Sequence, residues 1–213
     1  MKTIYLFSGL GADRRMFEFL EFQGYNTIFI NWITPEKYET IENYAKRLIS
    51  QIATPQPILI GLSFGGMIAI EVAKIIETEK IILLASAKTR NEVPVYFRIA
   101  GYLKLHTLLP GAVLKQSNFM TYWLFGAKTD FEKKLLKDIL YDTDSKFLIW
   151  AINQVLYWQN VTRHKNLIHI HGTADKILPI GRLQSDVNVK GGGHFMTINK
   201  ADELNEIIKK FLP

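Results

Sequence analysis

Short runs of β-branched and apolar residues alternate with amphipathic stretches along the chain, and this alternation limits the possible folds more than any other feature. The runs are Thr3–Phe7, Thr27–Ile30, Ile58–Ile60, Lys80–Leu84, Leu167–Ile170 and Asp186–Val189. The central runs are apolar at both odd and even positions, which is typical of strands that are covered on both faces in a parallel sheet. We therefore predict an α/β fold with a doubly wound, mostly parallel sheet of about six strands.

Two of the stretches between these runs have the periodicity of surface helices. Apolar residues recur every three or four positions in Thr40–Ile52 and again in Asp202–Leu212. This spacing places the apolar side chains on one face of a helix. We predict that both helices pack against the sheet.

Residues 88–162 interrupt the alternation, because they contain no convincing strand. Helical patterns appear in Phe131–Leu140 and in Phe147–Trp158, and the segment holds three of the four tryptophans of the chain. We predict a helical cap or lid, inserted into an α/β core that residues 1–87 and 163–213 form. Most of its aromatic residues are expected to be core, and a minority to line a pocket.

Composition excludes several classes of site. The 213 residues include no cysteine, which rules out disulfides, thiolate metal ligands and a cysteine nucleophile. The net charge of +6 could suggest a nucleic-acid partner, but the basic residues are dispersed and no basic run exceeds a pair. We predict no binding to nucleic acid, because a basic solvated surface accounts for the charge.

No segment predicts insertion into a membrane. The first apolar run is shorter than the ~7 residues of a signal-peptide core, and we interpret it as a strand. No apolar stretch approaches the ~20 residues that a transmembrane helix needs. The expected location is the cytoplasm.

A serine between two glycines is the first candidate for chemistry. Gly61–Gly65 reads GLSFG, with a predicted strand before it and a helical pattern after it. This is the G-x-S-x-G pattern of a nucleophile elbow, in which a strained turn lifts the serine hydroxyl clear of the sheet. The alternative interpretation is a purely structural turn. As a nucleophile, Ser63 would need a base.

His194 is the candidate base. It stands in Gly191–Phe195, which reads GGGHF and follows the last predicted strand. That position places His194 at the carboxyl edge of the sheet, the same edge at which we expect Ser63. An exposed loop histidine is the alternative.

Asp175 is the candidate carboxylate that would orient the imidazole. It follows the strand Leu167–Ile170, again at a carboxyl edge, although aspartate is also common in simple turns. Glu92 is a possible substitute acid, because it follows the strand Lys80–Leu84. We favour Asp175, which gives the chain order Ser, Asp, His.

Four motifs in this order resemble an α/β-hydrolase of the small esterase type. They are Phe7–Gly11 (FSGLG), Gly61–Gly65 (GLSFG), His171–Asp175 (HGTAD) and Gly193–Phe195 (GHF), and together they span nearly the whole chain. The order Ser, Asp, His is the one expected of that family. The resemblance implies a triad of Ser63, Asp175 and His194, with no cofactor and no metal.

The resemblance also implies an oxyanion hole and the site of ligand binding. The backbone N–H groups of Leu10 and Phe64 would be its two donors. Many relatives carry His-Gly where this chain has Ser8 and Gly9, so a role for a histidine side chain there is absent. Relatives often have two more strands in front, so the resemblance leads us to expect a minimal version of the fold. Residues 88–162 match the position of the lid, and the switch point of the sheet would lie between the first and third strands.

Two competing motifs are weaker. Gly9 and Gly11 resemble part of a dinucleotide-binding loop, but Arg14 stands where the third glycine belongs, and Asn31 and Trp32 stand where an acidic residue is expected. We predict no NAD or FAD site.

A metal pair is the second weak motif. His169 and His171 alternate on one predicted strand, but no further ligand lies at a recognisable spacing. We interpret them as core residues or as support for the site.

The sequence therefore predicts a serine hydrolase that acts on a small-molecule carboxylic ester or thioester with an apolar group. Two alternatives stay open. The fold also hosts lyases and cofactor-free oxygenase-like pockets, and a member could bind a ligand without turning it over. The sequence predicts neither the acyl length nor the oligomeric state.

Overall fold

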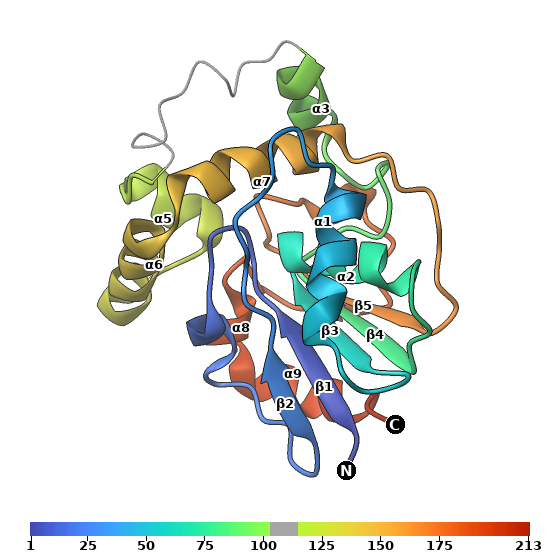
Figure 1. The fold of residues 1–213 in the computed structure, drawn as a ribbon. Helices are drawn as coiled ribbons and strands as arrows, with labels where there is room; N and C mark the ends of the chain where they lie inside the picture. Colours follow the sequence, from blue (N-terminus) through green and yellow to red (C-terminus); the bar gives the residue numbers. More distant parts are fainter. Residues whose placement is uncertain (103–114) are drawn as a thin grey trace.

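The computed structural model describes residues 1–102 and 115–213; residues 103–114, which belong to the predicted insertion, lie outside the described residues. Its strands are β1 (Thr3–Phe7), β2 (Asn26–Phe29), β3 (Ile58–Leu62), β4 (Lys80–Leu84), β5 (Leu167–Gly172) and β6 (Val187–Val189). They form one six-stranded sheet in the order β2-β1-β3-β4-β5-β6, and every neighbouring pair is parallel (Figure 1). The predicted fold class is confirmed.

The helices of the described residues lie between β2 and β3, between β3 and β4, in a group between β4 and β5, and after β6, whereas the connections from β1 to β2 and from β5 to β6 contain 3-10 turns. They are α1 (Ile41–Leu48), α2 (Phe64–Ala73), α3 (Val95–Tyr102), α5 (Phe119–Phe125), α6 (Asp130–Asp142), α7 (Ser145–Tyr157), α8 (Met196–Asn199) and α9 (Ala201–Lys209). Short 3-10 turns occupy Arg14–Phe17, Ile49–Gln51 and Ile180–Arg182. The two predicted surface helices correspond to α1 and α9, although both end earlier than predicted.

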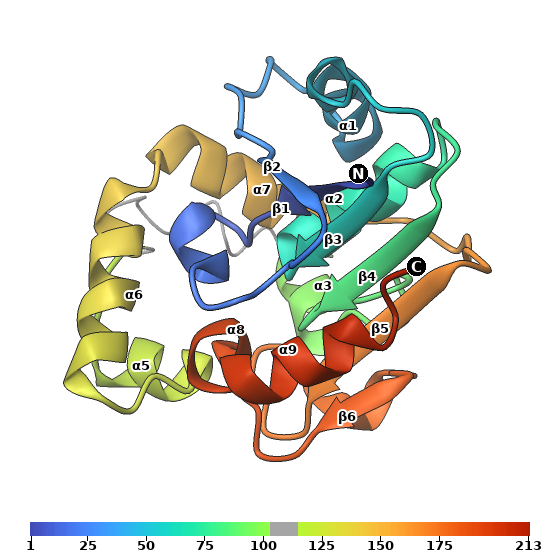
Figure 2. The same ribbon diagram turned by 90° about the horizontal axis from the view of Figure 1, so that it is seen from below.

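The sheet is covered on both faces, and its strands alternate between two apolar clusters. In β1, Ile4 and Leu6 belong to one cluster, and Tyr5 and Phe7 belong to the other. Helices α1 and α2 pack on the second face, while α8 and α9 pack on the first (Figure 2). Because successive strand residues point to opposite faces, runs that are apolar at both odd and even positions need helices packed on both faces of the sheet.

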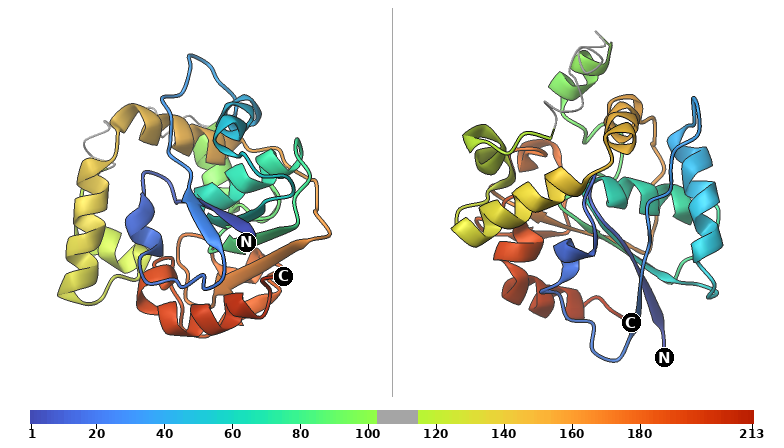
Figure 3. Two further views of the ribbon diagram at one scale, coloured as in Figure 1. Left: turned by 60° about the horizontal axis from the view of Figure 1, so that its bottom comes forward. Right: turned by 60° about the vertical axis from the view of Figure 1, so that its left-hand side comes forward.

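The inserted helices gather at one end of the molecule. Helices α3, α5, α6 and α7 lie beyond the carboxyl ends of the strands, opposite the two chain termini (Figures 1 and 3). The helical patterns predicted for Phe131–Leu140 and Phe147–Trp158 correspond to α6 and α7. The described residues of the segment contain no strand, as predicted.

A buried hydrogen bond joins the residue after α7 to α2. The indole N–H of Trp158 donates to Oε1 of Glu71 on α2, across 2.7 Å. Lys74 pairs with the same carboxylate at 2.8 Å, so the buried charge of Glu71 is compensated. No helix in the described parts of the chain is long and apolar enough to cross a membrane.

Candidate active site

The turn after β3 holds Ser63 in a strained conformation above the sheet. Its φ is 52° and its ψ is −121°, a region that residues with a side chain rarely adopt. The hydroxyl of Ser86 donates to the Ser63 carbonyl at 2.7 Å, and the Ser63 amide donates to the Leu84 carbonyl at 2.9 Å. These two bonds to the neighbouring strand end hold the turn in place.

Crowding explains the glycines around Ser63. A Cβ at Gly61 would collide with the backbone of Gly65 and Gly66, and a Cβ at Gly65 would collide with the backbone carbonyls of Phe7 and Ser8. The packing therefore leaves no room for a side chain at either position. Helix α2 begins at Phe64, directly after the serine.

The structure brings the three predicted side chains together. His194 Nε2 lies 2.8 Å from Ser63 Oγ, and His194 Nδ1 lies 2.7 Å from Asp175 Oδ2. An ionised carboxylate only accepts hydrogen bonds, so Nδ1 carries the proton and donates it to Asp175. Nε2 is then free to accept the hydrogen of the Ser63 hydroxyl.

Asp175 is held in its ionised form although it is buried. Burial raises the pKa of its carboxyl group, but the charge and hydrogen bond of His194, the amide of Leu178 and the nearby His171 together lower the pKa below its ordinary value. The amides of Ile177 and Leu178 donate to Oδ1 at 2.8 and 2.9 Å. The second oxygen is left for His194.

Glu92, the alternative acid, has different partners. Its carboxylate accepts from the backbone amide of Lys88 at 2.6 Å and from that of Gln184 at 3.3 Å. It therefore ties together two loops instead of contacting His194.

His169 and His171 lie beneath the site, in the interior of the sheet. Both are fully buried, and their rings meet edge to face with centroids 5.2 Å apart. His171 Nε2 lies 2.8 Å from the Leu178 carbonyl and 3.6 Å from Asp175 Oδ2. No three His, Asp or Glu side chains among the described residues are grouped to hold a metal ion.

Leu10 and Phe64, the predicted oxyanion residues, line the same cavity as Ser63. Phe64 is the first residue of α2, so its amide has no acceptor within the helix. Among the described residues, the Leu10 amide also makes no hydrogen bond. Ser8 donates its hydroxyl to the Ala12 carbonyl at 2.5 Å and so closes the loop on itself.

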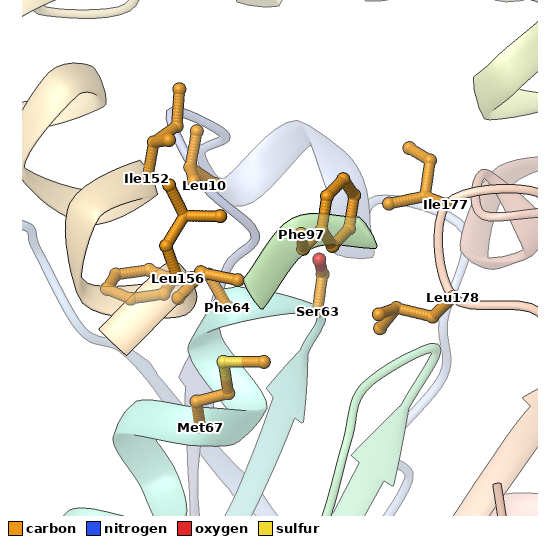
Figure 4. Close-up of a pocket in the computed structure, with 10 residues that line it drawn as sticks. Leu10, Ser63, Phe64, Met67, Phe97, Ile152, Leu156, Ile177 and Leu178 are labelled. Atoms are coloured by element: carbon orange, nitrogen blue, oxygen red, sulfur yellow. The ribbon is translucent and has the colours of Figure 1, made fainter. Parts of the chain in front are cut away.

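An apolar cavity of about 280 Å³ opens above Ser63 (Figure 4). Among the described residues of its lining, Ser63 is the only polar one, and the others are Leu10, Phe64, Met67, Phe97, Ile152, Val155, Leu156, Ile177 and Leu178. The arrangement can place an apolar group beside a nucleophilic hydroxyl.

Sequence reasoning missed most of this lining. Among the described aromatic residues of the insertion, Phe97 alone faces the cavity, and the other lining residues from the insertion are the aliphatic Ile152, Val155 and Leu156. The sequence of α7 could have indicated these residues, because the helix is apolar on more than one face and therefore has apolar side chains beyond those that pack in the core. Phe147 and Ala151 bury one side of that helix in the core, whereas Ile152 and Leu156 turn toward the cavity.

The comparisons with known proteins agree with this architecture. A sequence model of the alpha/beta hydrolase family matches residues 4–207, so the chain belongs to that family. No curated protein sequence matches the chain.

Many solved structures share the fold at low sequence identity. A lipase-esterase related protein from Clostridium acetobutylicum is 18% identical with a TM-score of 0.71, over 99% of this chain and 94% of that one. An esterase from Exiguobacterium antarcticum is 15% identical with a TM-score of 0.68, over 99% and 91%. A bromoperoxidase from Bacillus anthracis is 16% identical with a TM-score of 0.70, also over 99% and 91%. At these identities the likeness is one of fold.

Proposed function

We propose that the protein is a serine hydrolase that cleaves a carboxylic ester or thioester carrying an apolar group. The observation that carries this proposal is the hydrogen-bonded series Ser63, His194 and Asp175 at the base of an apolar cavity. Membership of the alpha/beta hydrolase family and the esterases among the structural neighbours support a hydrolase.

In this mechanism Ser63 Oγ attacks the carbonyl carbon while His194 Nε2 takes the hydroxyl proton. Asp175 holds the imidazole in the required tautomer and stabilises the imidazolium that forms. The Leu10 and Phe64 amides donate to the oxyanion of the tetrahedral intermediate. The imidazolium then protonates the departing alcohol or thiol, and the acyl group stays on Ser63.

Water completes the cycle by hydrolysing the acyl-enzyme. His194 accepts a proton from the water as the water adds to the acyl carbon, and then returns the proton to Ser63 as the acid leaves. No step of this cycle requires a cofactor. We also propose that residues 88–162 form a cap over a core of residues 1–87 and 163–213, and that the cap supplies one wall of the acyl site through α7.

A series of p-nitrophenyl esters tests this function, with Ser63→Ala as the matched variant. We expect wild type to hydrolyse the esters and Ser63→Ala to lose the activity. Equal rates for the two proteins would exclude Ser63 as the nucleophile.

A fluorophosphonate probe separates this proposal from the alternatives. One structural neighbour is named a bromoperoxidase and not an esterase, so a similar fold does not by itself define the reaction. A hydrolase serine reacts with the probe, so we expect labelling at Ser63. Folded wild-type protein that neither labels nor hydrolyses any ester would favour a lyase, an oxygenase-like pocket or a ligand-binding protein.

A further inference from the structure

The junction between α6 and α7 contacts the loop that follows β1. Thr143 ends α6, and Asp144 caps α7 by accepting the Phe147 amide at 2.7 Å. Thr143 is buried, and its Oγ1 lies 2.6 Å from the Gly11 carbonyl and 2.8 Å from the Ile139 carbonyl. A hydroxyl carries one hydrogen, and the shorter of the two contacts leads to Gly11.

Gly11 fits closely against Thr143. Its φ of +67° favours glycine, and a Cβ built there would meet the side chain of Thr143. Asp142, the residue before Thr143, adds a second contact, because its Oδ2 lies 2.8 Å from Nη2 of Arg15, in the 3-10 turn that follows this loop. The loop that carries the Leu10 amide is therefore fixed from above by the α6–α7 junction.

The start of α7 also holds Phe64, whose amide is the other proposed donor. The Phe64 ring is buried and meets the rings of Phe147 and Trp150 edge to face, with centroids 6.2 and 6.0 Å away. Trp150 is itself fixed, because its indole N–H donates to the Glu39 carbonyl at 2.8 Å. Aromatic contacts of this geometry add stability and restrict ring motion.

We propose that Thr143, Phe147 and Trp150, which we call the α6–α7 clamp, position the two oxyanion donors. This inference rests on the proposed hydrolase function. The three are positioning residues: Thr143 acts through Gly11, and the two aromatic residues act through Phe64. The insertion then has two separable roles, because the cavity wall of Ile152, Val155 and Leu156 lies further along α7.

Thr143→Val tests the clamp, since valine keeps the shape of threonine and removes its hydroxyl. We expect kcat to fall about tenfold, because the loop that carries the Leu10 amide loses one hydrogen bond that holds it in place. KM should change little. Thr143→Ser keeps the hydroxyl and should retain most of kcat. Gln154→Met is the matched control, because Gln154 Oε1 accepts the Ile41 amide at 3.0 Å and so joins the insertion to the core elsewhere.

A trifluoromethyl ketone adds a readout that a merely structural role would not change. Its adduct with Ser63 places an oxyanion where the transition state has one, so its affinity should fall by the same factor as kcat/KM in Thr143→Val. An unchanged affinity and an unchanged kcat in folded Thr143→Val would overturn the proposal.

Hydrogen exchange tests the clamp without any substrate. We expect faster exchange of the backbone amides of residues 8–14 in Thr143→Val, and wild-type exchange there in Gln154→Met. Unchanged exchange in Thr143→Val would show that the hydroxyl does not hold the loop. If wild type hydrolyses no ester, the proposed function fails, and the exchange result still decides whether the clamp exists.

Discussion

His194 Nε2 lies 2.8 Å from Ser63 Oγ, although 131 residues separate them in the chain. The contact exists because Ser63 follows β3 and His194 follows β6, and parallel strands end at the same edge of the sheet. The loop after β5 brings Asp175 to the other side of the imidazole, at 2.7 Å. Three loops of one sheet edge thus form a single hydrogen-bonded series.

Asp175→Asn should lower kcat by about 10³–10⁴-fold. The amide cannot replace the ionised acceptor of His194 Nδ1, and the histidine loses both its tautomer and the charge that stabilises the imidazolium. Ester hydrolysis under saturating substrate measures the effect. Glu92→Gln is the matched control, because the partners of Glu92 among the described residues are two backbone amides, and the rate of this variant should stay close to that of wild type. A larger loss in Glu92→Gln than in Asp175→Asn would contradict the assignment of the acid.

Leu156 should set the preferred acyl length. It lines the cavity from α7, so Leu156→Ala enlarges the space and Leu156→Phe reduces it. Each additional buried methylene is worth ~0.8 kcal/mol, which is about fourfold in kcat/KM. Over a series of p-nitrophenyl esters, the optimum should move to longer chains in Leu156→Ala and to shorter chains in Leu156→Phe.

Ile149→Ala provides the control for this series. Ile149 lies on the same helix, is partly exposed and does not line the cavity. Its acyl-length profile should match that of wild type. Identical profiles for all three variants would mean that the acyl group does not occupy the cavity beside α7.

Gly65→Ala should destabilise the fold by roughly 1–3 kcal/mol. The new methyl group would press on the backbone carbonyls of Phe7 and Ser8, which cannot rotate away as a side chain could. Gly181→Ala is the matched control, because a Cβ there meets nothing within 4 Å. Urea unfolding of the two variants measures the difference, and equal stabilities would show that the turn after β3 can relax.

The buried His169 should make the protein less stable in acid. Burial, with the nearby His171 and Lys88, lowers the pKa of its imidazole to about 3, whereas an unfolded histidine titrates near ~6.5. Between these values the unfolded chain binds the additional proton. The free energy of unfolding therefore falls as the pH decreases through this window and is fully retained above it.

His169→Leu tests this dependence. It removes two buried ring nitrogens that have no hydrogen-bond partner among the described residues. The slope of unfolding free energy against pH should decrease by up to about 1.4 kcal/mol per pH unit between about pH 6 and pH 4. Urea titrations at several pH values measure this slope. Burial also lowers the pKa of His171, so the variant should keep part of the pH dependence. A slope equal to that of wild type would show that His169 does not contribute.

Much of the fold could be predicted because its signals are local. Each strand carries its own apolar run, so the predicted ends of all six strands lie within two residues of the observed ends. The GLSFG turn is equally local, since the crowding that requires Gly61 and Gly65 arises within the strand–turn–helix unit and the neighbouring β1 loop. The position of each candidate group after a strand then placed Ser63, Asp175 and His194 at one edge.

The helix ends were less predictable. Thr40–Ile52 was predicted as one helix, but its last turn is a separate 3-10 segment after Leu48. Apolar spacing does not distinguish these two geometries, because both keep the same residues on the buried side over a single turn.

The sequence by itself determined the parallel α/β architecture, the strained serine turn and the order of the three candidate groups. Only the tertiary structure decided that His194 meets Asp175 and not Glu92, that aliphatic residues of α7 line the cavity, and that Thr143 contacts Gly11. The physical reason is the range of the interactions. Hydrophobic periodicity and turn chemistry act over a few neighbouring residues, whereas the contacts of His194 with Asp175 and of Thr143 with Gly11 join residues 19 and 132 positions apart. The first depends on the order of the strands in the sheet, and the second on how the helices between β4 and β5 pack on it.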